Sequence, residues 1–134
     1  MYVGAAVRFD LTGEVPLNMS DWTTLSQLAS LNVTTYDTVA VNALADSYEN
    51  SNVVGIVESK PTATTCNIRI QGISGNNYLG LDIFEEYYLS DIYPGAIVQL
   101  SQAPVNPGTV LLKIGQPTSP RRLLYFRGER ILRG

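Results

Sequence analysis

The sequence predicts an all-β fold, a small antiparallel β-sandwich or barrel with an N-terminal arm and one short helix. Three observations support this prediction. About eight short hydrophobic segments recur at intervals of roughly 8–15 residues, apolar and polar residues alternate within them, and Gly, Pro and Asn lie between them. The chain has 134 residues, of which 45% are hydrophobic, which suits a single domain with its own core.

We expect one compact domain in which residues 1–36 hold an N-terminal strand, an arm and a helix, and residues 37–134 form the β domain. Residues 2–9 are the first expected strand, and residues 14–19 form an extended arm around Pro16. Ser20 can cap a short helix over residues 20–30. The apolar stripe of this helix consists of Trp22, Leu25, Leu28 and Ala29.

The first part of the expected β domain contains three strands. Alternation over residues 39–43 predicts one, and the apolar segment 53–59 predicts the next. Residues 60–63 contain Pro61 and are expected to turn the chain into a strand over residues 64–72. Alternation in this last strand separates a core face, made by Cys66, Ile68 and Ile70, from a solvent face made by Asn67, Arg69 and Gln71.

The second part of the β domain has strands separated by clear turn signals. A strand at residues 87–89 is followed by a turn at Pro94-Gly95 and a strand near residues 96–100. The next expected strand, at residues 109–114, is broken at Gly115-Gln116-Pro117. The last expected elements are a strand at 123–126, a turn at Arg127-Gly128 and a strand at 129–132.

Residue types needed for common chemistry are scarce. The chain has no histidine and one cysteine, Cys66, which excludes the common zinc sites, Ser–His and Cys–His pairs, and an intrachain disulfide. We therefore predict no catalytic, cofactor or metal site, and no enzyme activity. A glycan-processing enzyme or a calcium site is the alternative interpretation of four acidic residues, which we otherwise expect in a solvated loop: Asp82, Glu85, Glu86 and Asp91.

Charge is distributed unevenly along the chain. Acidic residues outnumber the single Arg8 over residues 1–59, whereas five arginines lie near the C-terminus: Arg121, Arg122, Arg127, Arg130 and Arg133. These arginines are the candidate partner-binding residues. The alternative is a solvated terminus in which arginine side chains cover apolar surface. The net charge of −3 argues against nucleic acid as a partner, and no apolar run is long enough to predict a membrane span. We also expect no secretory signal at the N-terminus.

Residues 52–133 resemble a small β module of tailed-bacteriophage virion proteins. The resemblance lies in Val53-Val54-Gly55-Ile56-Val57 followed by a Thr-rich strand, Tyr87-Tyr88-Leu89-Ser90-Asp91, Pro94-Gly95-Ala96-Ile97, Ile114-Gly115-Gln116-Pro117 and Leu123-Leu124.

The resemblance implies a capsid decoration (cement) protein that stabilises the phage head by binding the major capsid protein or other virion proteins. Such a protein is made in the host cytoplasm and lies on the head surface of the virion as a homo-oligomer, with a trimer as the expected form. The alternative is a tail-associated fibre, adhesin or adaptor protein that binds the host surface or other tail proteins.

Overall fold

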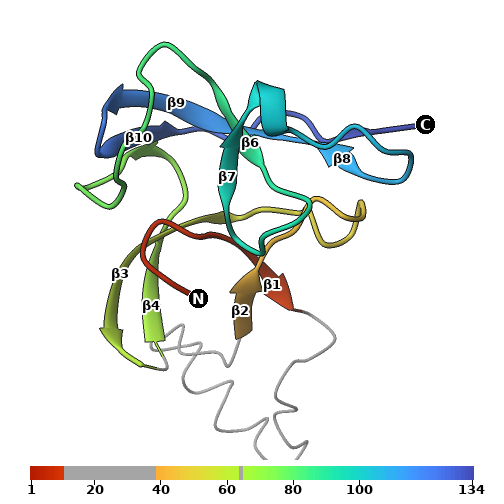
Figure 1. The fold of residues 1–134 in the computed structure, drawn as a ribbon. Coiled ribbons are helices and arrows are strands. Elements are labelled where there is room, and N and C mark those ends of the chain that lie inside the picture. Colours follow the sequence, from red (N-terminus) through yellow and green to blue (C-terminus); the bar gives the residue numbers. More distant parts are fainter. Residues whose placement is uncertain (11–38, 64) are drawn as a thin grey trace, which may run out of the picture. The chain divides into compact units, whose positions relative to one another are not determined.

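The computed structural model of the chain describes residues 1–10, 39–63 and 65–134. These residues confirm the all-β prediction: the strands form antiparallel sheets that do not close into a barrel (Figure 1). A short 3-10 helix, η2 (Leu100–Gln102), interrupts them. Within the described part of the chain, no helix is long and apolar enough to cross a membrane.

The chain divides into two compact units, one made of residues 1–8 with 42–134 and the other of residues 9–41. The expected arm at residues 14–19 and the expected helix at 20–30 lie outside the described residues. The predicted division at residue 36 therefore stays a prediction.

The first sheet has four strands in the order β2-β1-β3-β4. Its strands are β1 (Ala6–Asp10), β2 (Val39–Asn42), β3 (Gly55–Thr62) and β4 (Thr65–Arg69). Ala6 lies opposite Ile56 and Val57 lies opposite Ile68. The first expected strand is therefore confirmed but begins later than the sequence indicated, because Gly4 takes a positive φ of 90° that an extended strand does not allow.

The second sheet has five strands in the order β5-β10-β9-β6-β7, and a separate pair joins β11 to β8. The strands of the larger sheet are β5 (Gly72–Ile73), β6 (Tyr87–Leu89), β7 (Ile97–Gln99), β9 (Lys113–Ser119) and β10 (Arg122–Tyr125). The pair consists of β8 (Val110–Leu111) and β11 (Ile131–Leu132). The expected turn at Pro94-Gly95 is confirmed, with Gly95 at φ 77° between β6 and β7.

Buried side chains from both larger sheets join one hydrophobic core. Alternation along the strands places every second side chain on the covered face, as in β10, where Leu123 and Tyr125 are buried and Arg122 is exposed. The core consists of Ala6, Ala43, Ala45, Val53, Ile56, Tyr78, Leu81, Tyr87, Leu89, Val110, Leu112, Ile114, Leu123 and Tyr125.

The predicted core face of strand β4 is wrong at Ile70 and is only partly buried at Cys66 and Ile68, which are less exposed than Thr65 and Asn67. Ile70 is 76% exposed, and Cys66 and Ile68 are only half-buried. Ile70 follows the last residue of β4, so the alternation that ran through Cys66 and Ile68 no longer fixes its direction. Strand β4 also lies at the edge of its sheet, and the well-buried neighbours Ile56 and Val57 lie on β3 instead.

The expected break at Gly115-Gln116-Pro117 is wrong, because strand β9 continues through Pro117. The expected turn at residues 60–63 is confirmed but lies slightly later, because β3 continues through Pro61 to Thr62 before the chain returns as β4. Strand β6 pairs with β9 only at Lys113 and Gly115, so at Pro117 strand β9 pairs with β10 alone. The missing N–H of Pro117 therefore costs the sheet no hydrogen bond. In the same way β3 pairs with β1 only near its start, and β4 alone continues to Thr62.

Gly115 marks a close approach of two strands. A Cβ at this position would lie 2.2 Å from the main-chain oxygen of Leu124 on the paired strand β10. The Gly-x-Pro sequence therefore reflects tight packing of β9 against β10, where the sequence alone indicated a break.

Candidate interaction surface

The described residues offer no cluster of metal ligands. No group of three or more acidic or cysteine side chains among them could hold a metal ion, and Cys66 is a half-buried free thiol. What the structure does offer is a set of loops with fixed backbones that display arginine and large apolar side chains.

The acidic residues Asp82, Glu85 and Glu86 lie in the β5–β6 connection, and Asp91 lies in the β6–β7 turn. Asp82 accepts a hydrogen bond from the N–H of Phe84 through Oδ1, at 2.9 Å. Glu86 pairs with Lys113 at 2.9 Å and accepts a hydrogen bond from the Tyr88 hydroxyl. The hydrogen bond from Lys113, and then that from Tyr88, lower the pKa of Glu86. Glu85 and Asp91 are half-buried, and Glu85 donates its N–H to the main-chain oxygen of Asp82.

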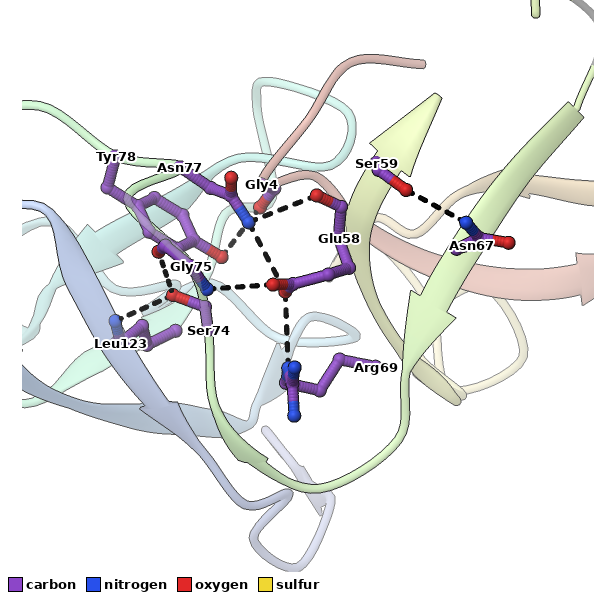
Figure 2. A network of polar contacts seen from close by, with 10 residues as sticks. All are labelled: Gly4, Glu58, Ser59, Asn67, Arg69, Ser74, Gly75, Asn77, Tyr78 and Leu123. Carbon is purple, nitrogen blue, oxygen red and sulfur yellow. Dashed lines mark hydrogen bonds and ion pairs between the residues drawn. The ribbon is translucent and has the colours of Figure 1, made fainter. Parts of the chain in front are cut away.

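Glu58 on strand β3 organises a polar network that holds the loop over residues 74–78 (Figure 2). Its carboxylate accepts hydrogen bonds from the Arg69 Nε at 3.2 Å, the Gly75 N–H at 2.8 Å and the Asn77 side-chain amide at 3.2 Å. Asn77 also donates to the main-chain oxygen of Glu58. Because the Glu58 side chain is only 24% exposed, these bonds are partly shielded from water and hold the loop against the first sheet.

The same loop is tied to the second sheet and to the N-terminus. Ser74 exchanges hydrogen bonds with Leu123 on β10: its N–H donates to the Leu123 oxygen, and its hydroxyl oxygen accepts from the Leu123 N–H. The buried Tyr78 donates its hydroxyl to the Gly4 oxygen at 2.9 Å. Burial, reinforced by the nearby Glu58, raises the pKa of Tyr78, so its hydroxyl stays protonated as a donor.

The five arginines predicted as partner-binding residues separate into two groups. Arg127, Arg130 and Arg133 hold the C-terminal segment against neighbouring loops. Arg127 donates to the Asn52 side chain and the Val53 oxygen. Arg130 donates to the Tyr48 oxygen and stacks 3.8 Å from the centre of the Tyr48 ring.

Arg133 completes this group, since its Nε donates to the Pro104 oxygen at 3.0 Å. Strand β11 pairs with β8 between Arg130 and Arg133. The guanidinium groups of these three arginines therefore have a clear structural role in the chain itself.

Arg121 and Arg122 form the second group, at the tight turn between β9 and β10. Both are exposed, and both bond to Asn76. The Arg122 Nε lies 2.8 Å from the Asn76 Oδ1, and an Arg121 Nη lies 3.5 Å from the Asn76 main-chain oxygen. The ion pairs formed among the described residues are Glu58–Arg69 and Glu86–Lys113, so within that set neither arginine has a carboxylate partner.

Leu79 lies on a segment whose backbone is hydrogen-bonded to the turn that carries these arginines. The Tyr78 N–H donates to the Arg121 oxygen at 3.1 Å, and the Leu81 N–H donates to the Pro120 oxygen at 3.0 Å. Tyr78 and Leu81 are core residues, whereas Leu79 between them is 85% exposed. We name Asn76, Leu79, Arg121 and Arg122 the Leu79–arginine surface.

Other exposed apolar side chains also lie on hydrogen-bonded loops. Phe84 is 88% exposed, and its N–H is held by Asp82. Ile92 and Tyr93 are exposed in the β6–β7 turn, where both of their N–H groups donate to the Ser90 hydroxyl oxygen. Sequence reasoning missed these residues and the Glu58 network, although the high turn content of residues 72–77 was a signal that this loop needed outside support.

Comparisons of the chain with protein-family models, with curated proteins and with solved structures found no match.

Proposed function

We propose that this chain is a bacteriophage virion structural protein, a capsid decoration (cement) protein that binds the major capsid protein on the head surface. One observation of the structure supports a docking role, namely that large apolar side chains are exposed on loops whose backbones are already fixed. Leu79, Phe84 and Tyr93 are the clearest examples. Placing the protein on a virion depends on the sequence resemblance of residues 52–133.

Fixed backbones matter because binding costs conformational entropy. A side chain on a preordered loop loses only its own rotamer freedom when a partner covers it, which is about 0.5–1.5 kcal/mol. Aromatic and apolar anchors of this kind carry most of the free energy in protein interfaces. Many copies on one shell would add such modest contacts through avidity.

The finer architecture belongs to the same proposal. We propose that the two larger sheets pack as a β-sandwich, since side chains from β3, β9 and β10 share one core. We also propose an N-terminal arm that reaches neighbouring subunits and a homo-oligomeric form, expected as a trimer.

Quantitative mass spectrometry of purified virus particles tests the proposed function. The expected result is a copy number of this chain in fixed proportion to the major capsid protein. A copy number in proportion to the tail proteins would replace the proposal with a tail-associated fibre, adhesin or adaptor. Absence of the chain from particles whose genome encodes it would refute both.

A further inference from the structure

We propose that the Leu79–arginine surface binds an acidic segment of a partner protein, in which carboxylates flank one apolar side chain. The apolar side chain would cover Leu79, and the carboxylates would pair with Arg121 and Arg122. This inference names the chemistry of the partner in the proposed function. It rests on that function only for the identity of the partner as a virion protein.

The first supporting observation is the unused donors of the two arginines. Asn76 occupies one N–H group of each guanidinium, and this leaves the other N–H groups without an acceptor among the described residues. Guanidinium forks pair with carboxylates through two parallel hydrogen bonds. The 2.8 Å hydrogen bond from Arg122 to Asn76 also orients the Arg122 side chain, so less freedom is lost there when a carboxylate binds.

The second observation is the charge of the turn itself. Arg121 and Arg122 are adjacent and carry like charges. Neither takes part in the two ion pairs formed among the described residues. A partner that brings carboxylates would relieve this repulsion. The Arg127, Arg130 and Arg133 group differs, since its guanidinium groups are already bonded to main-chain oxygens of the same chain.

The third observation is the position of Leu79. Tyr78 and Leu81, on either side of it, donate their N–H groups to the main-chain oxygens of Arg121 and Pro120. The apolar side chain and the two cations therefore come from segments in direct contact. An apolar residue beside two cations matches an acidic protein segment better than a nucleic acid. The chain also has a net charge of −3, which disfavours a polyanionic phosphate backbone.

The test titrates the isotope-labelled full chain with a short peptide that has one leucine flanked by glutamates on both sides, followed by two-dimensional amide NMR. We expect the largest shifts at residues 76–81 and 121–122, and weaker binding at high ionic strength. A peptide with lysines in place of the glutamates is the matched ligand control and should not bind. Shifts spread over the whole chain, or equal shifts with both peptides, would overturn the proposal.

Variants locate the site. Exposed arginine–carboxylate pairs contribute modestly, so R121Q and R122Q should each weaken binding roughly threefold and together about tenfold. Leu79→Ala should also weaken binding several-fold. Lys60→Gln removes one positive charge elsewhere, at a side chain that bonds to the Met1 and Ala63 oxygens, and should leave the affinity unchanged.

Two outcomes separate this inference from the proposed function. Peptide binding at this surface in a chain that is absent from virus particles would sustain the site and refute the virion assignment. No peptide binding, or shifts that depend on protein concentration alone because a second copy covers the surface, would overturn the site even where the chain is found on heads.

Discussion

Replacing Leu123 with Ala should destabilise the fold far more than the same truncation at Ile70. Leu123 is 0% exposed, lies in the centre of strand β10 and belongs to the shared core. Losing three buried carbon groups costs roughly 2 kcal/mol in transfer free energy at about 0.8 kcal/mol per CH₂. The cavity that remains adds to this, so we expect a total of about 3–5 kcal/mol.

Such a loss is a large share of the roughly 5–15 kcal/mol that stabilises an ordinary domain. The melting temperature should fall by roughly 10–20 °C. Equilibrium unfolding in urea measures the free energy directly, and the midpoint should fall while the slope stays unchanged.

Ile70→Ala is the matched control, because it also truncates a large aliphatic side chain, but one that is 76% exposed. Its cost should stay within about 0.5 kcal/mol. Alternation in the sequence had placed Ile70 in the core, so the pair of variants distinguishes the two assignments. An Ile70→Ala cost equal to or above that of Leu123→Ala would refute the structural assignment of the core.

Three further variants test other features of the fold. Gly115→Ala should destabilise by about 1–3 kcal/mol or more, measured by urea unfolding, because its Cβ would lie 2.2 Å from the Leu124 oxygen; an unchanged midpoint would contradict the close approach. Glu58→Ala should cost about 1–3 kcal/mol and speed amide exchange at Gly75, whose N–H it leaves unpaired; unchanged exchange would show that the network does not hold the loop. Burial raises the pKa of Tyr125 from 10.0 to about 12, so ionisation favours the unfolded chain, and stability present below pH 10 should be lost as the pH rises towards 12. Tyr125→Phe should reduce this alkaline loss, and an identical pH profile would argue against a buried hydroxyl.

The sequence predicted local features of the fold well and long-range ones poorly. Alternation and turn residues correctly placed β6, the Pro94-Gly95 turn and β7, because these signals act within a few residues. They failed at Gly115 and Ile70, where the outcome depends on which strand lies alongside. A glycine needed for strand contact and a glycine that breaks a strand look the same in a sequence.

The candidate surface depended even more on tertiary contacts. Sequence reasoning grouped five arginines by their closeness in the chain. Contacts of Arg127, Arg130 and Arg133 with residues 29 to 82 positions away show that three of them serve the fold itself. No sequence pattern indicates a role for Leu79, because its position depends on the hydrogen bonds that hold Tyr78 and Leu81 against the β9–β10 turn.

Photo-crosslinking on assembled particles tests most directly whether this chain docks on the capsid through the Leu79–arginine surface. A photoreactive amino acid would replace Leu79 in one variant and Ile70 in another, since both positions are highly exposed and neither supports the core. We expect crosslinks from position 79 to an acidic segment of the major capsid protein, and none from position 70. Crosslinks from position 79 only to tail proteins, only to a second copy of this chain, or to no protein at all would contradict this docking.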